Sequence, residues 1–390
     1  MKKRLFSLLC LAGLSAGVCV TTTSCSEDTF KVGLICLHDS SSTYDKNFID
    51  SMTAAVEAAG LDESQLEIIT GIPEDNTCYT TATELSGTCD NVFADSFGHE
   101  DYMLRAAREN PNVWFSHTAG VDNYYNAFAS IYEGRYLVGI AAGMKLNEMI
   151  DAGTITEGEA VIGYVGAYPY AEVISGFASF YLGARSVCPS ATMKVRYTSS
   201  WYDYDAEYNA AIALINNDDC VLISQHADSY GAPTACEQNN VPNVSYNIST
   251  ADQCPNTYLA CSRVDWTPYY TQMIEACMNG ETVSEKDYCG DLTTGSVVVD
   301  YSYSTNLASG TAEAIEAAEV QLNNGTLHVF DTSTFTVNGE TLASYLADVD
   351  DYGDYVGETE AVSDGYFHES EYRSAPYFDI IIDGITAINE

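Results

Sequence analysis

The stretch Lys31–Gly60 constrains the fold more than any other, because three different patterns follow one another in it. Val32–Leu37 is an apolar run of the length typical of a strand buried in a parallel sheet. A polar loop with His38 and Asp39 follows, and apolar residues then recur at helical spacing until Gly60. Strand, loop and helix in this order predict the first unit of an open α/β sheet, in which ligands lie beyond the carboxyl ends of the strands.

The same alternation runs through the chain in two consecutive series, which predicts an α/β protein with two Rossmann-like lobes, a hinge and an interlobe cleft. The polar segment 151–159, with two glycines, is interpreted as the crossing between lobes. Later patterns predict a strand at 295–300 and a long helix at 311–323 that return to the first lobe. The predicted boundaries are 31–150 plus about 290–330 for the N-terminal lobe, 151–289 for the C-terminal lobe, and 331–390 for an extension of uncertain placement.

The first residues have the features of an export signal. Lys2, Lys3 and Arg4 precede a short apolar core, which is too short to span a membrane. Ser24 is the small residue that a lipoprotein peptidase needs before Cys25. We therefore expect residues 1–24 to be a lipoprotein signal peptide, Cys25 to carry the lipid, and residues 25–30 to form a tether. Simple secretion is the alternative. The chain is exported in both cases, and a lipid at Cys25 is the only membrane contact expected.

The chain is strongly acidic, with 56 acidic and 15 basic residues. Removal of residues 1–24 would take away three basic residues and no acidic one, which leaves a formal charge near −44. Such a protein repels nucleic acid and anionic lipid, so neither is expected as a main partner. A content of 46% hydrophobic and 12% aromatic residues still describes a folded chain.

Ten cysteines lie beyond the leader, and their spacing is irregular with no CxxC pair. The sequence therefore predicts no zinc site and no cofactor. Cys36 belongs to an apolar run and is interpreted as a buried thiol. Disulfides remain open in an exported chain, and two closely spaced pairs could form local bridges: Cys78 with Cys89, and Cys254 with Cys261.

Polar and aromatic side chains follow the ends of several predicted strands, where a ligand in the cleft would meet them. The first lobe offers a loop with an aromatic residue and carboxylates, and the second offers a tryptophan in a polar loop. Local structural roles are the alternative for each, such as helix capping for Asp45 and turn capping for Asp39. The candidate ligand-binding residues are His38, Asp39, Phe48, Ser96, Phe97, Trp201, His226, Asp228, Asn247 and Trp266.

Several longer segments together carry a family resemblance. They are DKNF at 45–48, EGRYLVGIAAGMK at 133–145, IGYVGAYPYAEVISGFASFYLGARSVCP at 162–189, QHADS at 225–229 and W-x-x-YY at 266–270. In combination these segments resemble the basic membrane protein family, the PnrA-like substrate-binding lipoproteins of ABC transporters, over residues 31 to about 330. The resemblance implies a type I periplasmic binding protein fold, a purine nucleobase or nucleoside as ligand, and ABC permease subunits as partners.

The resemblance also implies roles for individual residues. Phe48 and Trp201 would sandwich the base from opposite lobes, and Asp39 would accept hydrogen bonds from it. Asn247 stands where nucleoside-binding members place an aspartate for the ribose, and Arg263 lies one position before the place of their lysine. Nucleobase and nucleoside therefore both remain open.

Two other classes of function are alternatives to a transport protein. A secreted nucleoside-cleaving enzyme would need a metal-binding aspartate cluster or a phosphate cradle, and neither spacing is present. His226 and Asp228 lack a neighbouring nucleophile elbow. A ligand-sensing receptor for a membrane signalling partner would use the same fold. The sequence favours a binding protein that is not an enzyme.

Overall fold

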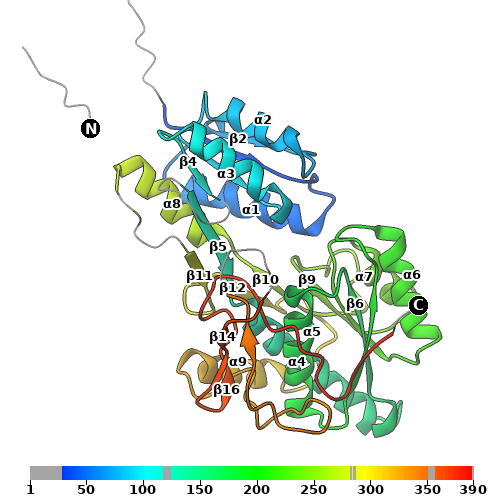
Figure 1. Cartoon of the computed structure of the whole chain (residues 1–390). Coiled ribbons are helices and arrows are strands. Elements are labelled where there is room, and N and C mark those ends of the chain that lie inside the picture. Colours follow the sequence, from blue (N-terminus) through cyan, green and yellow to red (C-terminus); the bar gives the residue numbers. More distant parts are fainter. Residues whose placement is uncertain (1–28, 117–123, 282, 284–286, 350–355, 389–390) are drawn as a thin grey trace, which may run out of the picture.

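The computed structural model describes residues 29–116, 124–281, 283, 287–349 and 356–388. The predicted leader and Cys25 lie outside these ranges. The described chain forms two α/β lobes, each built on its own sheet (Figure 1). This architecture confirms the predicted fold class.

The first lobe contains a six-stranded sheet in which every neighbouring pair is parallel. Side chains alternate between its faces: Val32 and Leu34 pack with helices α1 and α8, whereas Ile35 packs with α2 and α3. The strands in spatial order are β11 (Asp287–Gly290), β5 (Tyr124–Ala129), β4 (Trp114–Ser116), β3 (Asn91–Ala94), β1 (Val32–Ile35) and β2 (Leu66–Ile69), and the helices are α1 (Thr43–Ala58), α2 (Asn76–Leu85), α3 (Glu100–Glu109) and α8 (Thr267–Asn279).

The second lobe contains a seven-stranded sheet, parallel except where β12 pairs with β10. Helices α4 and α5 cover one face and α6 and α7 the other, while α9 packs on α4. The strands in spatial order are β12 (Val297–Asp300), β10 (Tyr258–Val264), β9 (Asn243–Tyr246), β8 (Leu222–His226), β6 (Val161–Gly166), β7 (Thr192–Tyr197) and β17 (Ile385–Ala387), and the helices are α4 (Ile131–Asp151), α5 (Ala171–Val187), α6 (Tyr204–Asn216), α7 (Gly231–Asn239) and α9 (Thr311–Asn323).

The predicted lobe boundaries are wrong in three places. Helix α4 packs on α5 and β10, so the chain enters the second lobe near residue 130 rather than at 151–159. The fully buried Arg135 fixes this helix, since its guanidinium donates to Ser224 Oγ at 2.7 Å and to Tyr164 Oη at 3.0 Å. Helix α8 and β11 lie in the first lobe, whereas β12 and α9 lie in the second. The chain thus crosses between the lobes three times: after β5, before α8 and after β11.

Helices α4 and α5 approach each other closely through glycines. A Cβ at Gly139 would overlap the backbone oxygen of Phe180, and one at Gly183 would overlap that of Tyr136. Gly139 and Gly143 of α4 therefore serve contact with α5, whereas Gly134 faces Val297 and Ser262 of the second sheet. Close backbone approach needs glycine at these positions because any side chain would push the helices apart.

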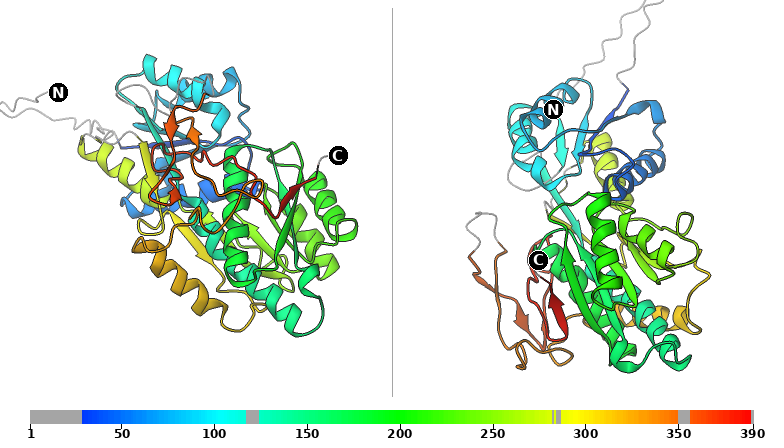
Figure 2. Two further views of the ribbon diagram at one scale, coloured as in Figure 1. Left: turned by 60° about the horizontal axis from the view of Figure 1, so that its bottom comes forward. Right: turned by 90° about the vertical axis from the view of Figure 1, so that its right-hand side faces the viewer.

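The C-terminal extension is part of the second lobe (Figure 2). Phe330, Phe367 and Phe378 join the main core of that lobe, and β17 adds an edge strand beside β7. Ser374 also reaches the strands that connect the lobes: its backbone N–H donates to Asp287 Oδ2 at 3.0 Å, and its carbonyl accepts from Asn126 Nδ2 at 3.3 Å. The extension has short pairings as well, formed by β13 (Leu346–Ala347) with β14 (Thr359–Glu360) and by β15 (Val362–Ser363) with β16 (Tyr366–Phe367).

Two further observations concern membrane and redox chemistry. None of the helices within the described ranges combines the length and apolar character that crossing a bilayer requires. All ten cysteines beyond residue 28 are free thiols, so the two bridges considered above are not formed.

Candidate functional site

Asp45 is the best-anchored polar residue of the first lobe. Ser42 caps α1 by accepting from the Asp45 backbone N–H, which sets the Asp45 side chain in the first turn. The buried carboxylate accepts from the His38 backbone N–H at 2.6 Å and lies 3.3 Å from His38 Nδ1. Burial would raise its pKa, but hydrogen bonds from His38 and Ser42 outweigh this and lower the pKa. The predicted capping alternative was wrong for Asp45, because Ser42 is the cap.

Asp95 lies beside Asp45 at the end of β3. Its Oδ1 accepts from the Leu37 backbone N–H at 3.1 Å, and the two carboxyl groups lie within 4.8 Å of each other. Burial, followed by repulsion from Asp45, raises the Asp95 pKa well above its usual range. The two aspartates therefore sit as a neutral acid beside a carboxylate, as expected when like charges share a buried site.

Asp228 is the corresponding carboxyl group of the second lobe, just after β8. Asn247, in the left-handed region with φ 67°, donates from Nδ2 to Asp228 Oδ1 at 3.0 Å. Burial raises the Asp228 pKa well above its usual range, and Glu207 and Glu172 add to the shift. The structure thus brings together Asp228 and Asn247, which the sequence singled out separately.

His226 lines the same region from the end of β8. Its Nε2 lies 3.2 Å from Glu172 Oε1, and its ring packs against Tyr246 at a centroid distance of 4.2 Å. Burial lowers the His226 pKa, with Glu172 opposing the shift. His226 is a buried residue whose ring nitrogen lies beside the Glu172 carboxylate.

The two lobes touch at the loop that precedes α1. The Thr43 backbone N–H donates to the Asp228 carbonyl at 2.8 Å, and Tyr202 Oη donates to Ser41 Oγ at 3.5 Å. The His38 and Tyr202 rings lie 5.4 Å apart. Carboxyl groups from both lobes also converge on Tyr44: its pKa is raised well above the usual value by burial and then by Asp95, Glu172, Asp228 and Asp45.

Phe48 and Trp201 are not arranged as the predicted sandwich of a base between them requires. Phe48 stacks on Trp266 at 4.7 Å and contacts Tyr44 at the same distance, so it belongs to the core of the first lobe. Trp201 is half-buried in the second lobe beside Tyr168 and Tyr170, at 5.4 and 6.1 Å. Among the ring contacts of the described residues, Phe48 and Trp201 do not meet each other. Trp201 nevertheless lies beside the acidic region, because its carbonyl accepts from the Asp228 backbone N–H at 2.9 Å.

Four other residues singled out from the sequence either have local partners or are exposed. Asp39 is exposed and accepts from the backbone and hydroxyl of Ser41, which is the turn-capping alternative. Ser96 donates to Glu74 Oε1 at 2.5 Å, and Phe97 is 72% exposed. Arg263 pairs with Asp265 at 3.0 Å rather than with any residue of the acidic region.

Sequence reasoning missed the importance of Asp45, Glu172, Tyr44 and Tyr202. Asp45 and Tyr44 carried a signal, since they open a helix directly after a strand and a polar loop. Glu172 occupies the equivalent place in the second lobe, at the start of α5 after β6. Only the tertiary structure shows that the start of α1 contacts the second lobe, where the Thr43 backbone N–H donates to the Asp228 carbonyl.

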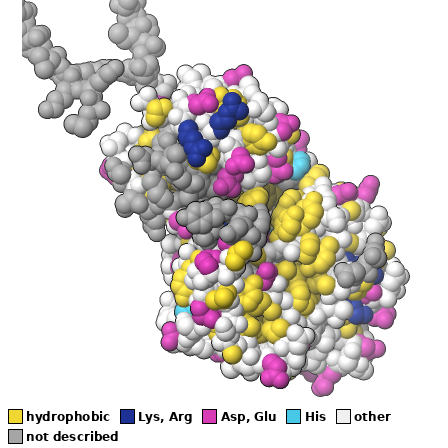
Figure 3. All heavy atoms as spheres, in the orientation of Figure 1, with side chains coloured by type: hydrophobic (Ala, Val, Ile, Leu, Met, Phe, Trp, Pro, Cys, Tyr) yellow, Lys and Arg dark blue, Asp and Glu magenta, His cyan; other side chains and the backbone are white. Residues whose placement is uncertain are grey.

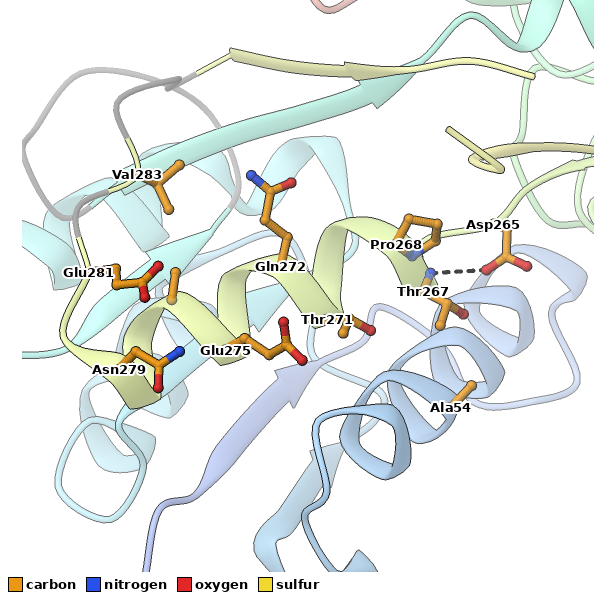
Figure 4. Close-up of a pocket in the computed structure, with 11 residues that line it drawn as sticks. Ala54, Asp265, Thr267, Pro268, Thr271, Gln272, Glu275, Asn279, Glu281 and Val283 are labelled. Atoms are coloured by element: carbon orange, nitrogen blue, oxygen red, sulfur yellow. Dashed lines mark hydrogen bonds between the residues drawn. The ribbon is translucent and has the colours of Figure 1, made fainter. Parts of the chain in front are cut away.

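A large open groove lies elsewhere, along the outer side of α8 (Figure 4). It has a volume of about 1140 Å³ and is lined mainly by α8, with Ala54 contributed by α1. Its lining is polar and acidic and includes Asp265, Glu275 and Glu281. Acidic side chains are also scattered over both lobes on the face in Figure 3, where basic ones are few. None of the predicted ligand residues lines this groove.

Comparison with known proteins supports the architecture. The family model described as "ABC transporter substrate-binding protein PnrA-like" matches residues 33–327. A purine-binding protein of Brucella abortus is 32% identical over 202 residues, which cover 51% of this chain and 54% of that protein. A Haloferax volcanii protein, provisionally named as an ABC transporter glucose-binding protein, is 34% identical over 217 residues, 55% of this chain and 52% of that protein. The chain thus spans about half the length of these curated relatives.

Solved structures agree on the fold. An ABC transporter solute-binding protein from Conexibacter woesei has a TM-score of 0.61 at 19% identity and covers 77% of this chain and 98% of its own. One from Aeropyrum pernix has a TM-score of 0.63 at 14% identity, with coverage of 77% and 93%. Identities this low establish the two-lobed fold alone.

Proposed function

Because the chain belongs to the PnrA-like family of ABC transporter substrate-binding proteins, we propose that it binds a purine nucleobase or nucleoside between its lobes and delivers it to an ABC permease. Proteins of this family bind solutes outside the cytoplasm and are not enzymes. The proposal includes export, removal of residues 1–24 and lipid attachment at Cys25. The purine ligand is suggested by the Brucella abortus relative and by the chemistry between the lobes.

The convergence of four carboxyl groups around Tyr44 supports the proposal most strongly. Asp45 and Asp95 come from the first lobe and Glu172 and Asp228 from the second. The start of α1 contacts both groups, since Tyr44 Oη donates to the Asp95 carbonyl and the Thr43 backbone N–H donates to the Asp228 carbonyl, each at 2.8 Å. A ligand for such a site must present donors. The N–H groups of a purine base and the hydroxyls of a ribose both meet this requirement.

Aromatic rings beside these acceptors favour a flat ligand. Trp201 is joined to Asp228 through the backbone and is flanked by Tyr168, while Tyr170 stacks on Tyr168 at 5.0 Å. Stacking of a base on an aromatic ring contributes about 1–3 kcal/mol. A hydrogen bond to a charged group adds about 1.5–3 kcal/mol. One or two stacks with two or three such bonds reach the roughly 8 kcal/mol of micromolar binding once ordering costs are subtracted.

A sugar is the second candidate, because the Haloferax volcanii relative carries a glucose-binding name and sugar hydroxyls also donate to carboxylates. The two ligands differ in what they need from Trp201. A purine would stack on it with its whole face, whereas a hexose would depend more on the carboxylates.

Titration calorimetry of the mature chain against guanine, hypoxanthine, guanosine and glucose tests the proposal. We expect binding of at least one purine and a loss of affinity of at least about tenfold in Trp201→Ala. Tyr204→Ala is the matched control, because Tyr204 stacks on Tyr208 within α6 and is 41% exposed. Binding of glucose with no response to any purine would replace the purine proposal, and unchanged affinity in Trp201→Ala would remove Trp201 from the site.

A further inference from the structure

Three buried side chains of different chemistry meet at the carboxyl ends of β1 and β3. Cys36 follows β1, Asp95 follows β3, and Asp45 lies in the first turn of α1. One Sγ and one oxygen from each carboxyl group all lie within 4.8 Å of one another. Cys36 is fully buried, and Asp45 and Asp95 are 1% and 3% exposed.

His99 lies beside Asp95 and is not one of the three residues whose ligand atoms are mutually close. Its side chain is fully buried, and Nε2 lies 2.9 Å from the Ile72 carbonyl, which requires the proton on Nε2. Nδ1 therefore carries a lone pair. This atom lies 4.0 Å from Asp95 Oδ1 and has no hydrogen-bond partner within the described part of the chain.

A second buried atom of the cluster also lacks a partner. Asp95 Oδ1 accepts from the Leu37 backbone N–H, but Asp95 Oδ2 accepts from no donor among the described residues. No lysine or arginine in those residues pairs with Asp45 or Asp95. Two buried polar atoms without hydrogen-bond partners are costly, and a cation that replaces the Asp95 proton would interact with both.

We propose that Cys36, Asp45, Asp95 and His99 bind one divalent cation of the zinc class. A thiolate, an imidazole nitrogen and carboxylate oxygens are the donors that Zn²⁺ prefers, and four of them complete a tetrahedral shell. The ligand atoms of Cys36, Asp45 and Asp95 lie within 4.8 Å of one another and draw together when an ion is bound, and His99 Nδ1, which lies 4.0 Å from Asp95 Oδ1, moves in to join them. Binding releases the Cys36 thiol proton and the proton held by Asp95 to solvent.

The surroundings of the cluster support the assignment. The Ile72 carbonyl fixes the tautomer of His99, and the His38 backbone N–H orients Asp45 through a 2.6 Å hydrogen bond. Metal sites typically hold their ligands by such outer hydrogen bonds. The sequence predicted no metal site because it lacks a CxxC pair. The four proposed ligands instead come from the end of β1 (Cys36), the start of α1 (Asp45) and the i,i+4 pair of Asp95 and His99. Asp45 and Asp95 also belong to the proposed solute site, but the metal is tested in the absence of any solute, so the two proposals can fail separately.

Cobalt titration tests the site in the mature chain after removal of bound metal with a chelator. Co²⁺ reports thiolate ligation by a charge-transfer absorption band, and elemental analysis after zinc reloading and dialysis gives the stoichiometry. We expect one ion per chain and a cobalt band in the unmodified protein. We also expect loss of the band in Cys36→Ser and affinity at least about tenfold lower in His99→Gln. Cys89→Ser is the matched control, because Cys89 is a buried thiol of the same lobe next to Thr88, outside the cluster.

The experiment separates the cation from a proton shared by the two carboxyl groups. If a proton alone holds the pair, the unmodified chain shows no cobalt band and retains no zinc, and the proposal is overturned. A band that survives in Cys36→Ser overturns it as well, since the thiolate would then lie elsewhere. The near-isosteric Asp95→Asn, checked for folding by circular dichroism, is expected to lose zinc while remaining folded. Zinc retained by folded Asp95→Asn at the level of the unmodified chain overturns the assignment of Asp95.

Discussion

Replacement of Phe48 by alanine tests whether this ring is a ligand face or part of the core. Phe48 is 5% exposed and lies 4.7 Å from both Trp266 and Tyr44. Phe→Ala changes in protein cores cost about 3–5 kcal/mol, because both apolar contact and a cavity are involved. We expect Phe48→Ala to lower the free energy of unfolding by that amount.

The loss can be measured by urea unfolding and by the melting temperature. For lobes of this size, 1 kcal/mol shifts the melting temperature by about 2–4 °C, so a decrease of about 6–20 °C is expected. Phe97→Ala provides the control because Phe97 is 72% exposed. Surface substitutions usually change stability by no more than about 0.5 kcal/mol.

The opposite result would refute this reasoning. If Phe48→Ala melts at the temperature of the unmodified chain but binds purines at least about tenfold more weakly, the Phe48 ring faces the ligand. The stack on Trp266 would then have to open when a ligand enters. A large stability loss with purine affinity retained would support a structural role.

Two further predictions concern helix packing and pH. Gly183→Ala is expected to destabilise the second lobe by about 1–3 kcal/mol in urea unfolding, because the new Cβ would overlap the Tyr136 carbonyl. Gly158→Ala is the control, because a Cβ at Gly158 meets nothing within 4 Å. Equal losses of stability in the two variants would contradict the close approach of α4 and α5. Burial raises the Glu369 pKa from 4.5 to about 7, against hydrogen bonds from Ser175, Tyr377 and Phe378, so the folded chain holds a proton that the unfolded chain releases. Stability should therefore fall as pH rises from about 4.5 to about 7. Glu369→Gln should reduce this dependence between pH 5 and pH 8, and an unchanged slope would contradict the assignment.

Local sequence determined the repeating units of this protein. Apolar runs such as Val32–Leu37 followed by polar loops and helical spacing predicted parallel strands and covering helices, and both sheets contain them. The positions of His226 and Asp228 at a strand end were readable for the same reason, since a strand end is defined by its own residues. Resemblance of longer segments then indicated the two-lobed binding fold.

Assignment of elements to lobes required the tertiary structure. The glycines of α4 signal close packing, but their spacing does not reveal that the partner is α5 rather than the first sheet. The sequence of β12 has the pattern of an ordinary strand, and only its antiparallel pairing with β10 in the structure places it in the second lobe. Sequence-adjacent elements are usually neighbours in space, and a fold whose chain crosses three times between lobes breaks that expectation.

The roles of individual side chains also depended partly on the sequence and partly on the tertiary structure. The sequence by itself determined which residues are apolar, acidic or aromatic, and where strands and helices place them. It could not determine that the Phe48 ring would stack on Trp266, or that Asp45, Asp95 and Cys36 would lie together in one buried place. Those contacts join residues far apart in the chain, so their energies depend on how the elements pack, and only the folded structure decides them.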